Sequence, residues 1–242
     1  MTRPNLGIIV FARMSSQRLP GKMLMDFGGQ PLLAHILLRA AALGLPLVVA
    51  TSDCREDDAL VDLAERYGVP AFRGSLDDVL QRAVHCANAH GFDAFARLCG
   101  DRPYFPQEQM RNALLSMENA LASGVPVDLI SNHFPESPPP GLTTEVVRVA
   151  ALQRALDSGA TAHNREHLTS YLYMHEAGFT IEFMPTEFVG LHGQRFSVDT
   201  EQDYQLLRSA ALQLADVNAS HEAVAAWLPA PVNPPAEDSV HG

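Results

Sequence analysis

A short segment near the start of the chain combines cations, hydroxyl groups and glycine, which together suit the binding of phosphate. It reads Arg13-Met14-Ser15-Ser16-Gln17-Arg18-Leu19-Pro20-Gly21-Lys22, and Lys22 is the only lysine among the 17 basic residues of the chain. Residues 1–25 hold four of those basic residues and no acidic one, although the whole chain has a net charge of −11. Arginine and lysine donate charge-assisted hydrogen bonds to phosphate oxygens, and glycine lets the backbone approach them. We therefore expect this segment, the basic loop (residues 13–22), to bind a polyanion.

The spacing within the basic loop differs from two familiar nucleotide-binding motifs. In a P-loop a Ser or Thr follows the lysine, whereas Met23 follows Lys22 here. The dinucleotide-binding pattern G-x-G-x-x-G does not occur in the chain. A nucleotide bound at this loop therefore needs a different phosphate site.

Further polar residues follow other predicted strands. They are Thr51-Ser52-Asp53, Arg73-Gly74-Ser75, Gly100-Asp101 and Asp199. Ligands of open parallel sheets bind beyond the carboxyl ends of the strands. Because the basic loop also follows a predicted strand, these segments should meet at one edge of the sheet and form one site.

The elements that would position these residues alternate between strands and helices. Short apolar runs predict strands at 7–12, 45–50, 69–73 and 92–98, and apolar residues at helical spacing predict helices at 31–43, 55–67 and 76–90, the last capped by Ser75. Strands separated by such helices require right-handed crossovers, which place helices on both faces of a parallel sheet. The first 125 residues thus predict an α/β fold with a mostly parallel, Rossmann-like sheet.

The second half of the chain is less regular. It predicts helices at 150–158 and 165–175, strands at 180–184 and 194–198, and a further helix capped by Thr200 and Asp203. We expect one domain over residues 1–228, with a small inserted lobe around 132–192 that packs against a partner subunit in a homodimer. Residues 229–242 are rich in proline, so a disordered tail is expected there.

The composition excludes several classes of protein. An acidic chain lacks the basic surface by which proteins bind nucleic acid. No run approaches the roughly 18–20 apolar residues of a membrane span, and the first apolar run, residues 6–12, is too short for a signal peptide. The three cysteines, Cys54, Cys86 and Cys99, share no CxxC spacing, which suits free thiols. We expect a cytoplasmic protein that binds neither nucleic acid nor a membrane.

The basic loop, continued by Gly28-Gly29-Gln30-Pro31-Leu32-Leu33, resembles the signature of the sugar cytidylyltransferases, which make CMP-linked acidic sugars such as CMP-KDO and CMP-sialic acid. The likeness is greatest to the spore-coat polysaccharide (SpsF) type. It continues in order through Phe72-Arg73-Gly74-Ser75-Leu76-Asp77-Asp78-Val79-Leu80, Gly100-Asp101-Arg102-Pro103, Gly141-Leu142-Thr143-Thr144-Glu145-Val146, Arg165-Glu166-His167-Leu168-Thr169 and Val198-Asp199-Thr200. The resemblance implies the nucleotide-diphospho-sugar transferase type of Rossmann-like fold.

The resemblance also implies a role for each matching residue. Arg13, Lys22 and Asp101 are implied as catalytic residues, and Asp101 and Asp199 as ligands of Mg²⁺, a hard cation that prefers oxygen ligands. The implied nucleotide-binding residues are Ala12, Arg13, Ser15, Arg18, Lys22, Asp53, Arg73, Ser75 and Asp77. The residues implied to bind the acceptor are Glu145, Arg165 and Glu166.

The implied reaction is Mg²⁺-dependent transfer of CMP from CTP to an acidic sugar or similar small acceptor, with release of pyrophosphate, in the synthesis of a surface polysaccharide or glycoconjugate. Two residues differ from the KDO and sialate enzymes. Cys99 stands where those enzymes carry a base-contacting glutamine, and Arg102 replaces a small or acidic residue. The preference for CTP and the identity of the acceptor therefore stay open.

Three other functions fit parts of the sequence. A glycosyltransferase that consumes a nucleotide sugar would have a similar sheet, but such enzymes commonly use a D-x-D metal motif, which this chain lacks. A non-catalytic nucleotide-binding homologue would not need Arg13, Lys22, Asp101 and Asp199 together. The segment His163-Asn164-Arg165-Glu166-His167 fits the HxxEH pattern of zinc hydrolases, which requires a third metal ligand.

Overall fold

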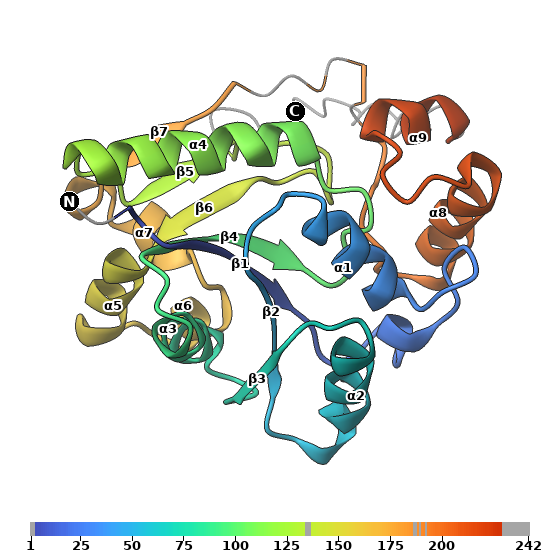
Figure 1. The fold of residues 1–242 in the computed structure, drawn as a ribbon, viewed down its shortest axis with the longest axis horizontal. Coiled ribbons are helices and arrows are strands. Elements are labelled where there is room, and N and C mark those ends of the chain that lie inside the picture. The colour runs from blue at the N-terminus through green and yellow to red at the C-terminus, as the bar shows by residue number, and fades with distance from the viewer. Residues whose placement is uncertain (1–2, 134–136, 186–187, 189, 192, 229–242) are drawn as a thin grey trace, which may run out of the picture.

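One seven-stranded sheet organises the part of the chain that the computed structural model describes, residues 3–133, 137–185, 188, 190–191 and 193–228 (Figure 1). The strands lie in the order β3-β2-β1-β4-β6-β5-β7. Their bounds are β1 (Leu6–Phe11), β2 (Leu47–Ser52), β3 (Ala71–Gly74), β4 (Ala94–Cys99), β5 (Leu129–Ser131), β6 (Glu145–Arg148) and β7 (Ile181–Phe183). All adjacent pairs are parallel except those that β6 makes with β4 and β5. The predicted α/β fold with a mostly parallel sheet is confirmed.

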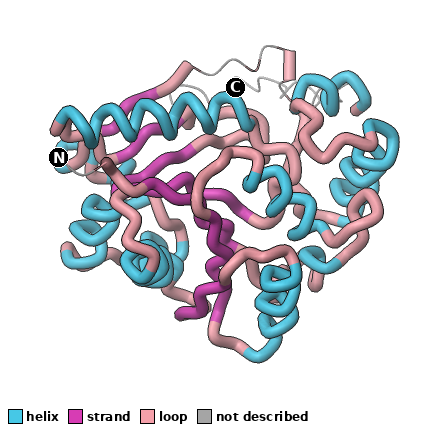
Figure 2. The backbone as a smooth tube through the Cα atoms, viewed as in Figure 1, coloured by secondary structure: helices cyan, strands magenta, loops and turns pink. Residues whose placement is uncertain are grey.

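Helices cover both faces of this sheet, as the cyan and magenta layers of Figure 2 show. The helices are α1 (Leu32–Ala41), α2 (Asp58–Arg66), α3 (Val79–Ala89), α4 (Gln107–Ser123), α5 (Val149–Asp157), α6 (Ala162–Glu166), α7 (Ser170–Met174), α8 (Glu201–Leu214) and α9 (His221–Trp227), with short 3₁₀ turns η1 (Lys22–Leu24), η2 (Arg55–Asp57) and η3 (Glu176–Gly178). One buried apolar cluster joins the sheet to α1, α2, α4, α8 and α9, and a second joins the opposite face to α3, α5 and α7. The two clusters hold the strand ends rigidly between the helical layers.

The alternation of side chains along β4 decides what faces each layer. Ala94, Ala96 and Leu98 belong to the cluster under α1 and α4, whereas Phe95 belongs to the cluster under α3 and α5. Successive side chains of a strand point to opposite faces, so Arg97 and Cys99 share the face of Phe95. Two polar residues therefore end an otherwise apolar face at the carboxyl edge of the sheet.

Most of the predicted strands occur, with one clear error. The runs at 7–12, 45–50, 69–73, 92–98 and 180–184 correspond to β1, β2, β3, β4 and β7. The strand predicted at 194–198 is wrong, because these residues bond to loops: Phe196 N donates to Pro140 O (2.7 Å) and Val198 N donates to Asp101 O (2.8 Å). Neither β5 nor β6 is predicted, although they are no shorter than β7 and β3.

Two helix predictions also need correction. Asp78, not Ser75, caps α3: its carboxylate accepts from Gln81 N (2.9 Å), while Ser75 Oγ accepts from Asp78 N (3.1 Å). The helix predicted at 165–175 consists of the two short helices α6 and α7, separated at His167, whose backbone (φ −103°, ψ 84°) leaves the helical region. The capping pair of Thr200 and Asp203 at the start of α8 is present as predicted.

The segment at 132–192, predicted as a lobe, contributes β6 and β7 to the main sheet, and its helices α5 and α6 contact α3. The predicted tail at 229–242 lies outside the described residues. Among the helices that the structure describes, none has the length and hydropathy needed to cross a bilayer.

Gly141 packs directly against the segment that leads to Asp199. Its φ is +99°, and a Cβ atom built there would lie 2.3 Å from the carbonyl carbon of Phe196. We expect Gly141→Ala to lower the free energy of unfolding by more than about 2 kcal/mol, because left-handed strain and a backbone collision add. Gly159→Ala is the matched control, since Gly159 has φ +77° but nothing within 4 Å of its Cβ position. Equal urea midpoint shifts for the two variants would show that the collision is unimportant.

Candidate active site

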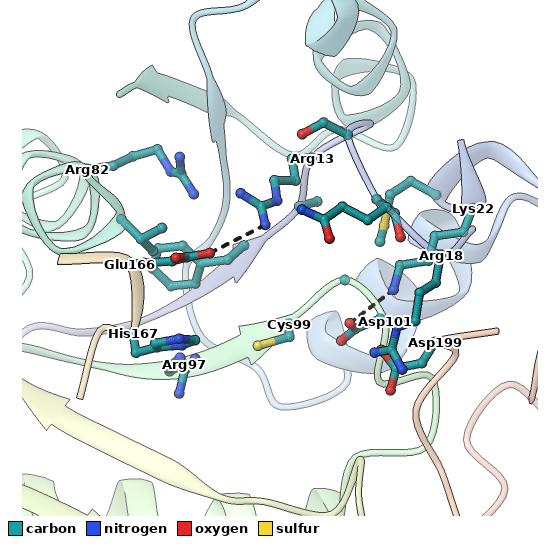
Figure 3. A pocket seen from close by; sticks show the side chains of 18 residues that line it. Arg13, Arg18, Lys22, Arg82, Arg97, Cys99, Asp101, Glu166, His167 and Asp199 are labelled. Carbon is teal, nitrogen blue, oxygen red and sulfur yellow. Dashed lines mark hydrogen bonds and ion pairs between the residues drawn. The ribbon is translucent and has the colours of Figure 1, made fainter. Parts of the chain in front are cut away.

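A pocket of about 430 Å³ opens at the carboxyl ends of β1 and β4, on the face covered by α3. It brings together these predicted site residues: Ala12, Arg13, Ser15, Arg18, Lys22, Asp101, Glu166 and Asp199. They come from the basic loop, the turn after β4, the end of α6 and the segment before α8. Figure 3 shows that their side chains surround one cavity, with Lys22, Arg18, Asp101 and Asp199 at one end.

Lys22 lies at the base of the basic loop, where Gly21 (φ +74°) turns the chain into η1. Its side chain is almost fully buried, and its Nζ donates to Val198 O (2.6 Å) and to Asp101 Oδ2 (3.1 Å). A buried lysine requires such partners, because an unpaired ammonium is costly to remove from water. Lys22 thus joins three segments that are distant in sequence.

Asp199 receives several donors at the same end of the pocket. Arg18 Nη2 donates to its Oδ1 (2.8 Å), while Arg195 Nη1 and Ser197 Oγ both donate to its Oδ2 (3.0 Å each). Since Val198 N bonds to Asp101 O, the segments that carry the two aspartates are adjacent. Cations therefore pair with both carboxylates.

The donor set at Asp101 and Asp199 fits a hard divalent cation. Both side chains line the pocket and are partly exposed, at 28% and 20%. No cluster of three or more His, Cys, Asp or Glu residues able to hold a metal occurs among the described residues. Mg²⁺ characteristically takes one or two protein carboxylates and completes its shell with water and substrate phosphates. Two carboxylates are thus sufficient for Mg²⁺, whereas a zinc site would need a third protein ligand.

The basic loop is anchored by a buried carboxylate that the sequence suggests only as a charge at a helix start. Asp57 accepts from Met14 N (2.7 Å), Thr51 Oγ1 (2.9 Å) and both the backbone N (3.0 Å) and Oγ (2.5 Å) of Ser52. Burial alone would raise the pKa of Asp57, but these hydrogen bonds hold it below its ordinary value. Asp57 thereby fixes the start of the loop against the end of β2.

We expect Asp57→Asn to lower the free energy of unfolding by about 1–3 kcal/mol at pH 7, since an amide cannot accept all four of these bonds. Because the pKa of Asp57 is lower in the folded than in the unfolded chain, its stabilisation is present above a pH of about 4 and is lost below it. The difference in the free energy of unfolding between Asp57→Asn and wild type, measured with urea, should therefore be smaller at pH 3.5 than at pH 7. Asp62→Asn, at an exposed position, is the control. A destabilisation by Asp57→Asn that increases toward low pH would contradict a lowered pKa of Asp57 in the folded chain.

Several residues implied to contact the nucleotide or the acceptor lie beside the main pocket. Ser75, Asp77 and Arg165 line an adjoining pocket of about 350 Å³, which shares Arg13 and Glu166 with the main one. Arg13 Nη2 and Glu166 Oε1 lie 3.9 Å apart at this boundary. The side chain of Arg165 pairs with Asp78.

Asp53 and Arg73 line neither pocket among the described residues. Asp53 is exposed, and its backbone N donates to Gly74 O (2.9 Å). Arg73 donates to Ser52 O (3.1 Å), Cys54 O (2.7 Å) and Asp58 Oδ1 (2.5 Å). These contacts connect β3 to the turn after β2.

Three basic or imidazole side chains of the pocket are absent from the predicted nucleotide, metal and acceptor residues: Arg82, Arg97 and His167. Glu145, implied as an acceptor residue, is instead buried behind Arg97 and outside the pocket lining. Arg97 could have been found from the alternation of β4, since a strand with Arg97 and Cys99 on one face must end in a polar environment. Arg82 gives no comparable signal, because a charged residue in an amphipathic helix usually faces solvent.

The histidines of the HxxEH segment lie close together, with ring centroids 4.5 Å apart. His167 lies beyond the end of α6, however, so the two histidines do not share a regular helical face. The described residues supply no third ligand near them. The described geometry does not support the zinc-hydrolase alternative.

Comparison with known proteins agrees with the geometry of the pocket. The family model described as "Cytidylyltransferase" matches residues 7–219. The spore coat polysaccharide biosynthesis protein SpsF of Bacillus subtilis is 31% identical over 224 residues, covering 88% of this chain and 90% of that protein. A cytidylyltransferase structure from Leptospira borgpetersenii superimposes with a TM-score of 0.82 at 26% identity, covering 91% of this chain and 92% of the other.

A structure of CMP-2-keto-3-deoxy-manno-octonic acid synthetase complexed with CTP has a TM-score of 0.66 at 20% identity, covering 87% of this chain and 99% of the other, and so shows the shared fold. The family match spans the basic loop, both aspartates and the sheet that carries them. The chain therefore belongs to the cytidylyltransferase family and is a nucleotidyltransferase.

Proposed function

We propose that this enzyme transfers CMP from CTP to a small acidic acceptor, releases pyrophosphate, and requires Mg²⁺. The observation that carries the proposal is the placement of Lys22, Arg13 and Arg18 together with Asp101 and Asp199 in one pocket (Figure 3). Cations there would neutralise a triphosphate, and the two carboxylates would hold the metal that binds it. The relationship to SpsF, a spore coat polysaccharide biosynthesis protein, supports a role in surface polysaccharide or glycoconjugate synthesis.

In the proposed reaction, an acceptor oxygen attacks the α-phosphorus of CTP in line. The new bond joins that oxygen to the α-phosphorus, the bond to the bridging α–β oxygen breaks, and pyrophosphate leaves with the electron pair. The proton of the attacking hydroxyl passes to solvent. Arg13, Arg18 and Lys22 would stabilise the charge that accumulates on the leaving group. Asp101 and Asp199 would hold Mg²⁺, which supplies further charge neutralisation on the phosphate oxygens when bound.

The remaining predicted residues would position the substrates. Ala12 and Ser15 line the pocket next to the phosphate-binding cations. Ser75 and Asp77 in the adjoining pocket would face the nucleoside, with Asp53 and Arg73 supporting the same edge. Glu166 and Arg165 would border the acceptor, because Glu166 lines both pockets.

A screen for pyrophosphate release tests this proposal. Each of the four ribonucleoside triphosphates is mixed with Mg²⁺ and either KDO, N-acetylneuraminate or the neutral sugar mannose. We expect release with CTP and an acid, and none with mannose or after addition of EDTA. Turnover of a nucleotide sugar without pyrophosphate release, or no turnover of any nucleotide, would contradict the proposal.

A homodimer is also part of the proposal. β7 is an edge strand of the described sheet, and Phe183 within it exposes 41% of its surface. Met174, at the end of α7, exposes 66%. Exposed apolar side chains beside an open strand edge favour association. Light scattering at the concentrations of the activity assay should give the mass of two chains; a monomeric mass would exclude the dimer.

A further inference from the structure

The active-site pocket has a second cationic end, opposite Asp101 and Asp199. Arg97 and Arg82 lie there together with His167 and Glu166 (Figure 3). Cys99 lies between them and the metal-binding end. Of the described side chains that line this end, only Glu166 is acidic. Two guanidinium groups at one end of a pocket in an acidic protein suggest an anionic group on the ligand that binds there.

The side chain of Arg97 is held in place by Glu145, which is buried on the side away from the pocket. The register of β4 with β6 pairs Ala96 with Val146, which places Arg97 opposite Glu145 on the next pair. Arg97 Nη1 donates to Glu145 Oε2 (2.5 Å), and Glu145 Oε1 accepts from Thr169 Oγ1 (2.8 Å) and Tyr173 OH (2.9 Å). Nε and Nη2 of Arg97 have no hydrogen-bond partner among the described residues.

Stability is a weak reason to keep this buried pair. The Arg97 side chain is 20% exposed and that of Glu145 is 5% exposed, on the sheet face that also carries Phe95 and its apolar cluster. Replacing a buried ion pair by apolar residues of similar volume is often neutral or stabilising, since desolvation offsets much of the attraction. The pair is better explained by a need for an oriented cation at the surface of the pocket.

Arg82 adds a second, independent sign of a ligand at this end. It is 97% buried in α3, lines the pocket, and has no hydrogen-bond partner for its Nε among the described residues. Its Nη1 donates only to the carbonyl oxygens of Ser75 and Leu76. None of the described carboxylates is paired with Arg82, so its charge is left for another group in the pocket to neutralise.

We infer that Arg97, oriented by Glu145 and assisted by Arg82, binds the carboxylate of the acceptor and selects acidic acceptors over neutral ones. The inference rests on the proposed function, since it assigns the metal-binding end of the pocket to the nucleotide. Arg97 contacts the acceptor directly, whereas Glu145 is a positioning residue. Glu145 would then act on the acceptor through Arg97 rather than touch it.

Calorimetric titration of the whole protein tests this assignment. The protein is first saturated with α,β-methylene-CTP and Mg²⁺, so that no turnover occurs, and is then titrated with KDO, N-acetylneuraminate and the methyl ester of each acid. We expect Arg97→Gln to weaken binding of the preferred acid by about 10- to 150-fold, the usual value of a charge-assisted hydrogen bond, and to leave the ester unaffected. The preference for acid over ester should therefore disappear.

Further variants separate binding from folding. The double variant Arg97→Met/Glu145→Met removes both charges of the ion pair together. Its core should therefore stay folded while the preference for acids is lost. Arg97→Lys should recover part of the acid affinity, and Glu145→Gln should weaken it less than Arg97→Gln does. The control is Arg66→Gln on α2, where the cation contacts only its own helix (Nε to Asp62 O, 3.2 Å).

Three results would overturn the inference. The first is that no acid binds the loaded wild-type protein more tightly than its ester. The second is an unchanged preference for acids in Arg97→Gln. In the third, Arg97→Gln weakens α,β-methylene-CTP itself by the same factor, which would assign Arg97 to a nucleotide phosphate. Failure of wild-type protein to bind the CTP analogue would instead contradict the proposed function.

Discussion

Asp101→Asn should reduce the rate of pyrophosphate release by at least about 10³-fold, the largest effect expected of any single substitution in this protein. The amide keeps the shape of the side chain but removes the negative charge with which it would hold Mg²⁺, and the loss of metal-ion charge stabilisation costs several kcal/mol. Asn also cannot balance the Lys22 ammonium 3.1 Å away. The measurement is the initial rate of pyrophosphate release at saturating CTP and acceptor.

The same variant should stay folded, because Asp101 is 28% exposed and its backbone bond to Val198 is unchanged. Raising the Mg²⁺ concentration should restore some activity if the lesion is in metal affinity. Asp62→Asn, an identical chemical change on the exposed side of α2, provides the control and should keep full activity. Turnover of a folded Asp101→Asn protein within about tenfold of wild type would remove Asp101 from the proposed mechanism.

Lys22→Met should lower kcat by about 10²–10³-fold, comparable to the removal of one preorganised donor from a developing oxyanion. Methionine matches the four-atom stem of lysine but lacks the ammonium, so it cannot donate to Val198 O or to a leaving phosphate. The effect should appear mainly in kcat rather than in KM, because the charge on pyrophosphate develops as the bond breaks. Steady-state kinetics with varied CTP provides both constants.

Lys22→Arg distinguishes a general need for positive charge from a need for this particular cation. The Lys22 side chain is only 7% exposed, between Asp101 and Val198 O at 3.1 Å and 2.6 Å, a space suited to a compact ammonium and too small for a planar guanidinium. We therefore expect little rescue by arginine. The control is Arg66→Met on α2; a Lys22→Met enzyme that keeps wild-type kcat would show that Lys22 has only a structural role.

Short-range patterns were sufficient to predict the first four strands and the three helices between them. Strands β1 to β4 and helices α1 to α3 are recognisable because strand-like and helix-like apolar patterns alternate there and end at a glycine or polar turn. The same patterns miss α4, β5 and β6, and they wrongly predict a strand at the extended segment 194–198. Extended residues form a strand only where a neighbouring strand has free backbone groups, and pairing of this kind depends on distant parts of the chain.

The candidate site was predictable to a similar extent. Residues that follow strands, such as Arg13 and Asp101, could be assigned to one edge because parallel strands share their direction. Asp199 lies at the same edge although the strand predicted before it is absent. The environment of Glu145 could not be predicted in this way. Its contact with Arg97 depends on the register of β4 against the antiparallel β6, and a shift of β6 by one residue would turn Glu145 to the other face.

The types and order of residues along the chain therefore suffice to identify the family, the parallel sheet and the cations and carboxylates of the pocket, because these features are local or follow from strand direction. Only the folded chain shows that Lys22 is buried between Asp101 and Val198, that Asp57 anchors the basic loop, and that Arg82 and Arg97 form a second cationic end. These contacts join residues from 43 to 176 positions apart. Their geometry comes from packing of the helices against both faces of the sheet. The apolar periodicity of a single helix or strand does not predict this packing.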